Sequence, residues 1–262
     1  MKIGLLLVEE SPAGVQQLIQ TVAFQFIQDH ELFSIEINDQ SEVKVQRYQK
    51  EQILFSQEFE APMIRPSHLR NEVDPAIFDQ FDQVVVLGEK SNIGNDLLEK
   101  LTISHLHIPL IDGDTGQNLG YDTALDSIVD QILKVKDTIN SMKYDHPRIF
   151  GIQLPEGLSE NLIQDVVVAV NEHRIQDMLE LEGIATLLKQ SIANGKTYGF
   201  IIFDEHLNPN EVVKQLEQYV AVDWKYVQID QSLILGPYPS GADRLIANKL
   251  AQKIIQWCLS HK

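Results

Sequence analysis

The sequence is poor in cysteine and has no long apolar run. Its one cysteine, Cys258, has no partner for a disulfide within the chain, which argues against a disulfide-held secreted domain. The longest apolar runs, 3–8 and 84–87, are far shorter than the roughly 20 residues that cross a bilayer. The start, Met-Lys-Ile-Gly, leads into an apolar run without the pattern of a signal peptide. We therefore expect a cytoplasmic protein with no membrane segment.

Basic residues are also scarce. The chain has 21 Lys and Arg against 38 Asp and Glu, which gives a net charge of -17. Binding to nucleic acid requires clustered Lys and Arg, so we expect no nucleic-acid partner. Any site for an anionic ligand must be locally positive against this overall field. With 262 residues, 44% of them hydrophobic, the chain can bury a substantial core and suits one large or two smaller α/β domains.

Apolar periodicity predicts strands alternating with helices. Strands are expected at 3–8, 84–87, 108–111, 148–154, 198–203 and 232–235, with short exposed strands or a hairpin in 33–59. Helices are expected at 15–28, 95–104, 123–138, 161–171, 181–193, 210–220 and 243–260. Asp122 or Thr123 can cap the helix that begins near 123. This alternation is typical of parallel sheets covered by helices on both faces.

Two aspartates flank a glycine in the segment Ile108-Pro-Leu-Ile-Asp-Gly-Asp114, and Gly-Tyr-Asp-Thr-Ala follows at 120–124. The segment resembles the catalytic segment of 6-phosphofructokinases, in which a strand ends in Pro-Gly-Thr-Ile-Asp-Asn-Asp and a helix opens with Gly-Phe-Asp-Thr-Ala. The resemblance implies that Asp112 is the base toward a sugar hydroxyl and that Asp114 is the neighbouring catalytic carboxylate. Two aspartates around a glycine are also a frequent turn motif, so a purely structural role remains open.

The nucleotide side of the resemblance is uneven. The family's glycine-rich phosphate loop corresponds to 9–16, where Glu9 and Glu10 replace two glycines. Two like charges a few ångströms apart repel by roughly 1 to 4 kcal/mol at effective dielectrics of 80 to 20, so a phosphate would be opposed there. Two interpretations of this loop stay open. It is either a solvated acidic turn or a pair of carboxylates that perform new general acid and base chemistry. The family's second phosphate loop corresponds to Gly88-Glu89-Lys90-Ser91.

The resemblance implies a set of nucleotide-side site residues. Gly88, Ser91 and Arg70 would bind the cofactor, and Glu89 would bind the metal, with ATP and Mg²⁺ as the cofactors of an active enzyme.

The sugar side has lost more of the family pattern. Arg148 and Glu205 correspond to substrate-binding residues, and the family's arginine at the first of these positions reaches a neighbouring subunit. The Met-Gly-Arg element is absent after 154, and Gln231 and Ser240 stand where phosphate-binding arginines are expected. Each charge-assisted hydrogen bond to a phosphate contributes roughly 1.5 to 3 kcal/mol, and neither glutamine nor serine replaces it.

As a divergent, truncated phosphofructokinase-like protein, the chain is expected to have an α/β fold of two α/β/α sandwich domains with mainly parallel sheets. The resemblance places a nucleotide-side domain at 1–123 plus about 237–262 and a sugar-side domain at 124–236. It also implies a homo-oligomer, because Arg148 would contribute to a neighbouring subunit.

Two functions follow from this mixture of kept and lost residues. The first is a protein with a degenerate ATP and fructose 6-phosphate site, non-catalytic or impaired, that acts by binding a ligand such as a phosphorylated sugar or nucleotide, or a protein partner. The alternative is an active magnesium-dependent 6-phosphofructokinase or related sugar kinase. Under the alternative, Asp112→Asn abolishes turnover.

Overall fold

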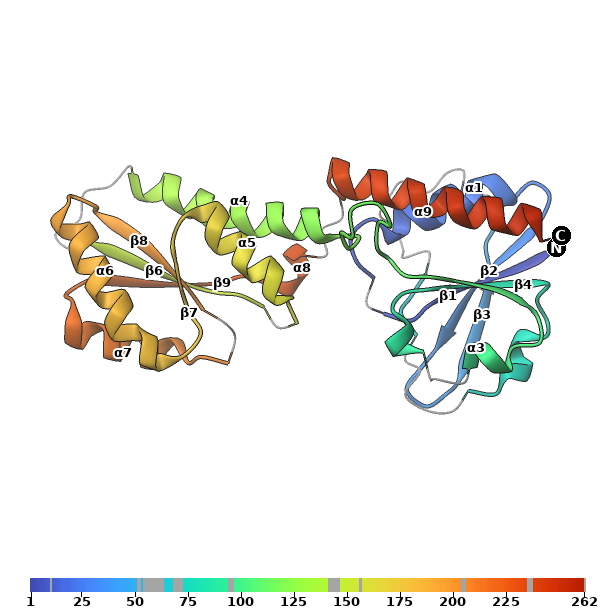
Figure 1. The fold of residues 1–262 in the computed structure, drawn as a ribbon, viewed down its shortest axis with the longest axis horizontal. Helices are drawn as coiled ribbons and strands as arrows, with labels where there is room; N and C mark the ends of the chain where they lie inside the picture. The colour runs from blue at the N-terminus through green and yellow to red at the C-terminus, as the bar shows by residue number, and fades with distance from the viewer. Residues whose placement is uncertain are drawn as a thin grey trace. The chain divides into compact units, whose positions relative to one another are not determined.

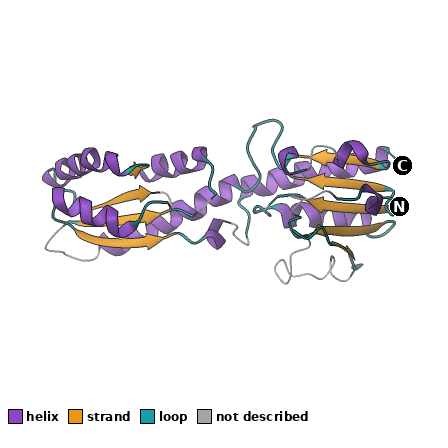
Figure 2. Cartoon of the chain, turned by 90° about the horizontal axis from the view of Figure 1, so that it is seen from below, coloured by secondary structure: helices purple, strands orange, loops and turns teal. Residues whose placement is uncertain are grey.

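The computed structural model describes residues 1–9, 11–50, 53, 64–67, 73–93, 97–140, 147–155, 157–203, 206–234 and 238–261. The chain divides into two compact units, Met1–Thr123 with Pro237–Lys262, and Ala124–Gly236. Each unit is a sheet between helices, as Figures 1 and 2 show. Glu10 and the predicted site residues Arg70 and Glu205 lie outside the described residues.

The first unit is built on a five-stranded sheet of order β3-β2-β1-β4-β5. All neighbouring strands are parallel except β2 and β3, which form an antiparallel pair. The strands are β1 (Lys2–Leu7), β2 (Glu31–Ile37), β3 (Val43–Arg47), β4 (Gln83–Leu87) and β5 (Ser104–Ile108). The helical segments are α1 (Val15–Phe26), η1 (Pro75–Phe78), η2 (Lys90–Asn92), α3 (Leu97–Lys100) and α9 (Gly241–Ser260).

Both faces of this sheet are buried, which explains the uninterrupted apolar runs of β1 and β4. Leu5 of β1 faces the core formed with α1 and α9, while Leu6 faces the core that contains Phe78 of η1 and Leu97 of α3. Helices α1 and α9 lie side by side on one face of the sheet (Figure 1). The last helix of the chain therefore completes the core that the first strand begins.

The second unit has a four-stranded sheet, fully parallel, of order β7-β8-β6-β9. Its strands are β6 (Arg148–Gln153), β7 (His173–Ile175), β8 (Tyr198–Phe203) and β9 (Asp223–Gln228). Its helical segments are α4 (Tyr121–Asn140), whose first turn lies in the first unit, α5 (Glu160–Val170), η3 (Met178–Glu180), α6 (Leu181–Ala193), α7 (Pro209–Tyr219) and α8 (Gln231–Ile234). Side chains of α4 and α5 pack on one face, and those of α6 and α7 on the other.

Three expected elements are wrong in position or type, and two observed strands were not expected. The helix expected at 95–104 is, in its described part, the shorter α3 (Leu97–Lys100), and β5 begins at Ser104. The strand expected at 108–111 runs instead from Ser104 to Ile108, and it ends where Pro109 removes a backbone donor. The strand expected at 232–235 is in its described part the short helix α8, whose start is favoured by Asp230 accepting a hydrogen bond from the amide of Ser232. Strands β7 and β9 were not expected. Strand β7 is short, and β9 lies at the edge of its sheet and carries exposed polar side chains.

The start of α4 is held by a residue that lies far away in the sequence. The carboxylate of Asp243, which is fully buried, accepts hydrogen bonds from the amides of Gly120 at 2.6 Å and Thr123 at 2.8 Å. The Thr123 hydroxyl donates to the same carboxylate at 2.5 Å. This contact performs the role expected of Asp122 or Thr123, since a carboxylate satisfies the free amides at a helix start.

No helix in the described part of the chain is long and apolar enough to span a membrane.

Candidate functional site

The candidate site lies in the first unit, at the carboxyl ends of β1, β4 and β5. In open α/β sheets this edge is where ligands bind. Backbone hydrogen bonds join the three loops, from the amide of Val8 to the carbonyl of Leu87 at 2.9 Å and from the amide of Gly88 to the carbonyl of Ile108 at 3.0 Å. The loop that carries Glu9, the loop that carries Glu89 and the segment that carries Asp112 therefore leave adjacent strands at one edge.

Asp112 and Asp114 share one ammonium group. The Nζ of Lys249, on α9, lies 3.0 Å from Oδ2 of Asp112 and 3.2 Å from Oδ2 of Asp114. The other oxygen of Asp112 accepts a hydrogen bond from the amide of Asp114 at 3.0 Å. The side chain of Asp112 is 5% exposed and that of Asp114 is 82% exposed, so the first is held in the fold and the second faces solvent.

These contacts favour the ionised form of Asp112. The pKa of Asp112 is lowered, first by the hydrogen bond from the Asp114 amide and then by the hydrogen bond from Lys249. The pKa of Lys249 is raised by its hydrogen bonds to Asp112 and Asp114. Asp112 is therefore an ionised carboxylate at neutral pH, as a general base must be, but its charge is already compensated by the ammonium.

The loop expected to approach nucleotide phosphates is occupied by a side chain of the protein. Oε2 of Glu9 accepts a hydrogen bond from the amide of Glu89 at 2.8 Å. Gly88, beside it, has φ of 120°, and a Cβ added there would lie 3.0 Å from Cγ of Glu9. The absence of a side chain at Gly88 thus leaves the space that the Glu9 side chain fills. A carboxylate resembles a phosphate oxygen in charge and in its preference for amide donors.

The described residues fit a magnesium nucleotide poorly. Glu89, Lys90 and Ser91 have exposed side chains on and before η2. Among the described residues, no group of three or more His, Cys, Asp and Glu side chains could hold a metal ion. The carboxylates of Asp112 and Asp114, at the same edge of the sheet, already bind an ammonium. A magnesium ion bound only by Glu89 would depend on phosphate oxygens for its other ligands.

Arg148 and the residues near the end of β6 belong to the second unit. The Nε of Arg148 donates to Oδ2 of Asp223 on β9 at 2.8 Å, and its Nη2 contacts the same oxygen. The side chain of Arg148 is 16% exposed, so its guanidinium is engaged within its own chain. Gln231 begins α8. In the first unit, the Ser240 hydroxyl accepts a hydrogen bond from the Asp243 amide and caps α9.

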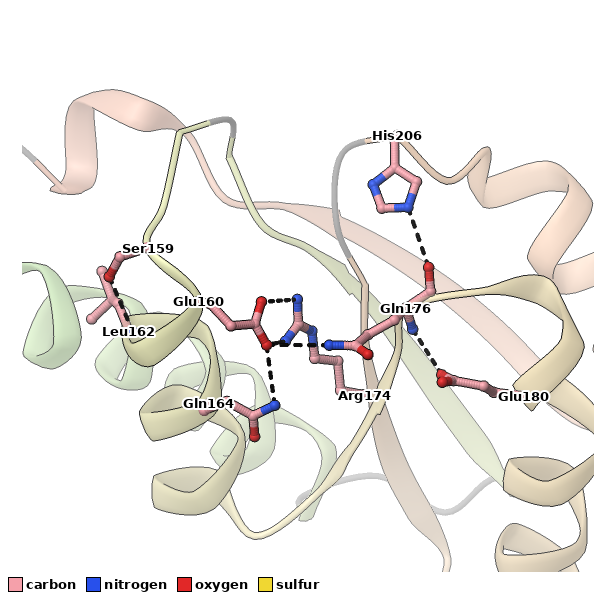
Figure 3. Close-up of polar contacts among 8 residues, drawn as sticks. All are labelled: Ser159, Glu160, Leu162, Gln164, Arg174, Gln176, Glu180 and His206. Atoms are coloured by element: carbon pink, nitrogen blue, oxygen red, sulfur yellow. Dashed lines mark hydrogen bonds and ion pairs between the residues drawn. The ribbon is translucent and has the colours of Figure 1, made fainter.

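A second polar cluster lies beyond the carboxyl end of β7 (Figure 3). The Glu160 carboxylate, in the first turn of α5, accepts hydrogen bonds from Arg174 Nη1 at 2.5 Å and Nη2 at 3.1 Å. The side-chain amides of Gln176 and Gln164 donate to it at 3.2 and 3.3 Å. Four donors lower the pKa of Glu160, and Arg174 is the largest cause. His206 Nε2 contacts the carbonyl oxygen of Gln176 at 3.2 Å, which extends the cluster to the loop after β8.

This cluster anchors α5 to β7. The side chain of Arg174 is 7% exposed and that of Glu160 is 59% exposed, so a buried cation is covered by a partly solvated carboxylate. The Ser159 hydroxyl accepts from the Leu162 amide as the cap of α5, and Oε2 of Glu180 accepts from the Gln176 amide. The cluster is satisfied from within and fixes local structure.

Sequence reasoning missed Lys249, Asp243 and Arg174. Lys249 and Asp243 lie on α9, and neither belongs to a local motif that contains the groups it binds. Arg174 is followed two residues later by Gln176, and both project toward the start of α5, a proximity that depends on the unexpected strand β7.

Several curated proteins are similar to the chain. The ATP-dependent 6-phosphofructokinase of Pediococcus pentosaceus is 31% identical over 190 residues, which cover 68% of this chain and 58% of the relative. That of Macrococcus caseolyticus is 30% identical over 208 residues, 74% of this chain and 60% of the relative. That of Clostridium botulinum (strain Alaska E43) is 27% identical over 188 residues, 66% of this chain and 55% of the relative. The chain thus spans between 55% and 60% of these relatives.

Solved structures share the fold. The phosphofructokinase of Pichia pastoris in the T-state aligns with 97% of this chain and 30% of its own, with a TM-score of 0.74 and 15% identity. A pyrophosphate-dependent phosphofructokinase from Marinobacter aquaeolei aligns with all of this chain and 76% of its own, with a TM-score of 0.70 and 10% identity. No family model matches the sequence. The expected fold of two α/β/α sandwiches with mainly parallel sheets is confirmed.

Proposed function

Because the chain belongs to the 6-phosphofructokinase family, we propose that it is a divergent member that binds a ligand or partner and does not transfer phosphoryl groups from ATP efficiently. The observation that carries the proposal is the contact between the Glu9 carboxylate and the Glu89 amide. The relatives are named as ATP-dependent enzymes. In this chain an amide that the resemblance assigns to nucleotide phosphates is satisfied by the protein itself.

The energetic reason is that ATP would have to displace a carboxylate and then lie close to it. A hydrogen bond to a charged group contributes about 1.5 to 3 kcal/mol, and repulsion between the displaced carboxylate and a phosphate adds roughly 1 to 4 kcal/mol at effective dielectrics of 80 to 20. The hydrogen-bond cost alone lowers affinity by about tenfold or more, since about 1.4 kcal/mol corresponds to a factor of ten, and the repulsion lowers it further.

The acceptor side supports the same proposal. The Arg148 guanidinium is paired with Asp223, and the Ser240 hydroxyl caps α9, so neither is free to bind a sugar phosphate. Asp112 and Asp114, the candidate catalytic pair, both contact Lys249, whose single positive charge offsets one of their two negative charges. The ligand class that remains open is a phosphorylated sugar or a nucleotide that binds without being turned over, with Asp112, Asp114, Gly88, Glu89 and Ser91 as candidate contacts.

A second candidate is an active magnesium-dependent 6-phosphofructokinase or related sugar kinase. The observation in its favour is the pair Asp112 and Asp114, because the lowered pKa of Asp112 keeps it ionised as a base requires. Under this candidate Lys249 orients the pair, and Glu9 moves aside when nucleotide binds. ATP and Mg²⁺ would then be the cofactors.

Turnover decides between the two candidates. We expect the purified parent to produce no fructose 1,6-bisphosphate above background from fructose 6-phosphate with Mg²⁺ and either ATP or pyrophosphate. The matched control is Asp112→Asn, which removes the charge of the proposed base and keeps its shape. Parent activity that is equal to that of Asp112→Asn supports the proposal. Activity in the parent that is lost in Asp112→Asn overturns it in favour of the kinase.

The proposal extends to assembly and location. We infer a cytoplasmic homo-oligomer, at least a dimer, and its support includes large apolar side chains on the surface, such as Leu179 at 89% exposed and Val168 at 73% exposed. Light scattering at micromolar concentration tests this assembly. A single species at the monomer mass of 29.8 kDa would contradict it.

A further inference from the structure

The ammonium group of Lys249 is held beside the aspartate pair by the packing of its helix. Ile246 and Leu250, before and after it in α9, are buried in the core of the first unit. The hydroxyl of Thr21 on α1 donates to Oδ1 of Asn248 at 3.1 Å, which joins the two helices next to this lysine. The backbone of Lys249 is therefore fixed by its neighbours, and its side chain, 36% exposed, reaches the site from a defined position.

The turn that carries the two aspartates is fixed by its own hydrogen bonds. The amide of Asp112 donates to the carbonyl oxygen of Gln117 at 2.9 Å, and the amide of Gly116 donates to the carbonyl oxygen of Asp112 at 2.7 Å. Oδ1 of Asp112 accepts from the amide of Asp114, while Oδ2 of each aspartate contacts the same Nζ. Two carboxylate oxygens that converge on one cation are an arrangement that also suits a divalent metal ion.

A second lysine faces the same turn from farther along α9. A Cβ added to Gly113, between the two aspartates, would lie 3.4 Å from Nζ of Lys253. Lys249 and Lys253 are four positions apart, a spacing that places them on one face of the helix. The two negative charges of the turn are thus faced by two positive charges, which weakens the field that would attract a metal ion.

We propose that Lys249 takes the place of a divalent metal ion at Asp112 and Asp114, and that the protein thereby keeps magnesium out of this part of the site. The inference deepens the proposed function and rests on it for the class of ligand. An ammonium group has three donors, of which the aspartates accept two, so one donor can reach an oxygen of a phosphate ester. A ligand at this edge therefore meets an ammonium where a metal ion would otherwise bridge the carboxylates.

A metal ion can bind this pair only by displacing the ammonium or by lying beside it. Both arrangements leave a positive charge near a divalent ion, and like charges a few ångströms apart repel. Magnesium also requires nearly octahedral oxygen ligands, and oxygens shared with Lys249 serve it poorly. Removing the charge of Lys249 should open the pair to a divalent ion, because the turn keeps its own hydrogen bonds.

Manganese alone is the probe, because carboxylates also bind Mn²⁺ and this ion broadens the NMR signals of nearby nuclei. We would titrate the ¹⁵N-labelled full chain and follow the amides of residues 112–114, so that binding elsewhere on the acidic surface is not counted. Lys249→Met removes the charge and keeps a long side chain, and Lys249→Gln is a second neutral variant should the first fail to fold. Lys249→Arg keeps the charge. Lys189→Met, an exposed lysine on α6 of the second unit, is the matched control.

We expect the neutral variants to bind Mn²⁺ at residues 112–114 about tenfold more tightly than the parent, or more, and Lys249→Arg and Lys189→Met to match the parent. Equal affinity of the parent and the neutral variants at these amides, whether tight or unmeasurable, would overturn the inference. Selective Mn²⁺ binding by the parent at these amides would overturn it without any variant. Tight binding by Lys249→Arg would also overturn it, because the exclusion would then depend on the shape of lysine and not on its charge.

These outcomes are separate from the test of the proposed function. None of them changes the contact between Glu9 and the Glu89 amide, which carries that function and which turnover tests. Magnesium-dependent turnover by a parent that binds no Mn²⁺ at residues 112–114 would overturn the proposed function and leave the role of Lys249 intact.

Discussion

At the carboxyl edges of both sheets, charged side chains bind other groups of the protein. The two edges differ in how far apart in the sequence the bonded residues lie. In the first unit Asp112 pairs with Lys249, 137 residues later, and Glu9 binds the amide of Glu89, 80 residues later. In the second unit Glu160 and Arg174 are 14 residues apart. The contacts at the first edge therefore depend on the tertiary fold, through helix α9 and the loop after strand β1. The contacts at the second edge join one helix, α5, to the strand that follows it, β7.

This difference predicts where each edge is vulnerable. A change on α9 should affect the site of the first unit, the start of α4 and the core at once, because α9 supplies Lys249, Asp243 and buried apolar side chains. A change in the cluster of the second unit should remain local.

The largest effect is expected for Asp243→Ala. The substitution leaves the buried amides of Gly120 and Thr123 without their acceptor, and such a loss costs roughly 3 to 5 kcal/mol. Urea unfolding of the parent and variant measures it. Asp130→Ala, an exposed aspartate on α4, is the matched control and should change the free energy of unfolding by less than about 0.5 kcal/mol. Similar losses in the two variants would show that α9 does not anchor α4.

A smaller effect, visible in its pH dependence, is expected for Lys249→Met. The lowered pKa of Asp112 gives stability that is present above its unfolded pKa and is lost as pH falls through its folded pKa. Removing the ammonium raises that pKa, so the variant should lose stability at a higher pH than the parent. Thermal melts between about pH 7 and about pH 3 would follow this shift, since the range contains ordinary aspartate pKa values. Lys189→Met, an exposed lysine on α6 of the second unit, should keep the parent profile.

The smallest effect is expected for Glu160→Gln in the second unit. The pKa of Glu160 is lowered mainly by Arg174, so its contribution is lost as pH falls through the folded value, and the amide variant should lack this dependence. Hydrogen exchange should become faster in the first turn of α5 and stay unchanged in the first unit. Glu182→Gln, an exposed glutamate in the first turn of α6, is the control. Faster exchange across both units would contradict the local character of this cluster.

The sequence was sufficient for much of the fold, because apolar runs and helical stripes report burial directly. The elements α6 (Leu181–Ala193) and β8 (Tyr198–Phe203) match the expected bounds. The edge strand β9 was missed because it alternates weakly and carries Lys225 and Gln228, whereas buried strands are continuously apolar. The strand expected at 108–111 was displaced because its pattern includes Pro109, which cannot donate to a ladder.

Only the part of the candidate site that lies in local motifs could be predicted from the sequence. Asp112, Asp114 and the loop from Gly88 to Ser91 belong to contiguous motifs, and the structure places them at or near adjacent strand ends. Lys249 could not be expected to join them, because the contact depends on how α9 packs on the sheet. The replacement of glycines by Glu9 and Glu10 indicated repulsion of a phosphate, but the hydrogen bond of Glu9 to the Glu89 amide joins residues 80 apart and belongs to no local motif.

Calorimetric titration with magnesium ATP tests the central claim, that the first unit blocks its own phosphate loop, most directly. We compare the parent with the double variant Glu9→Gly, Glu10→Gly at neutral pH. The parent should show no measurable binding, and the variant should gain roughly 1 to 3 kcal/mol, less than the full repulsion because glycine also loosens the loop. Glu9→Gly alone should account for most of the gain. Equal affinities, or tight binding by the parent, would contradict the account.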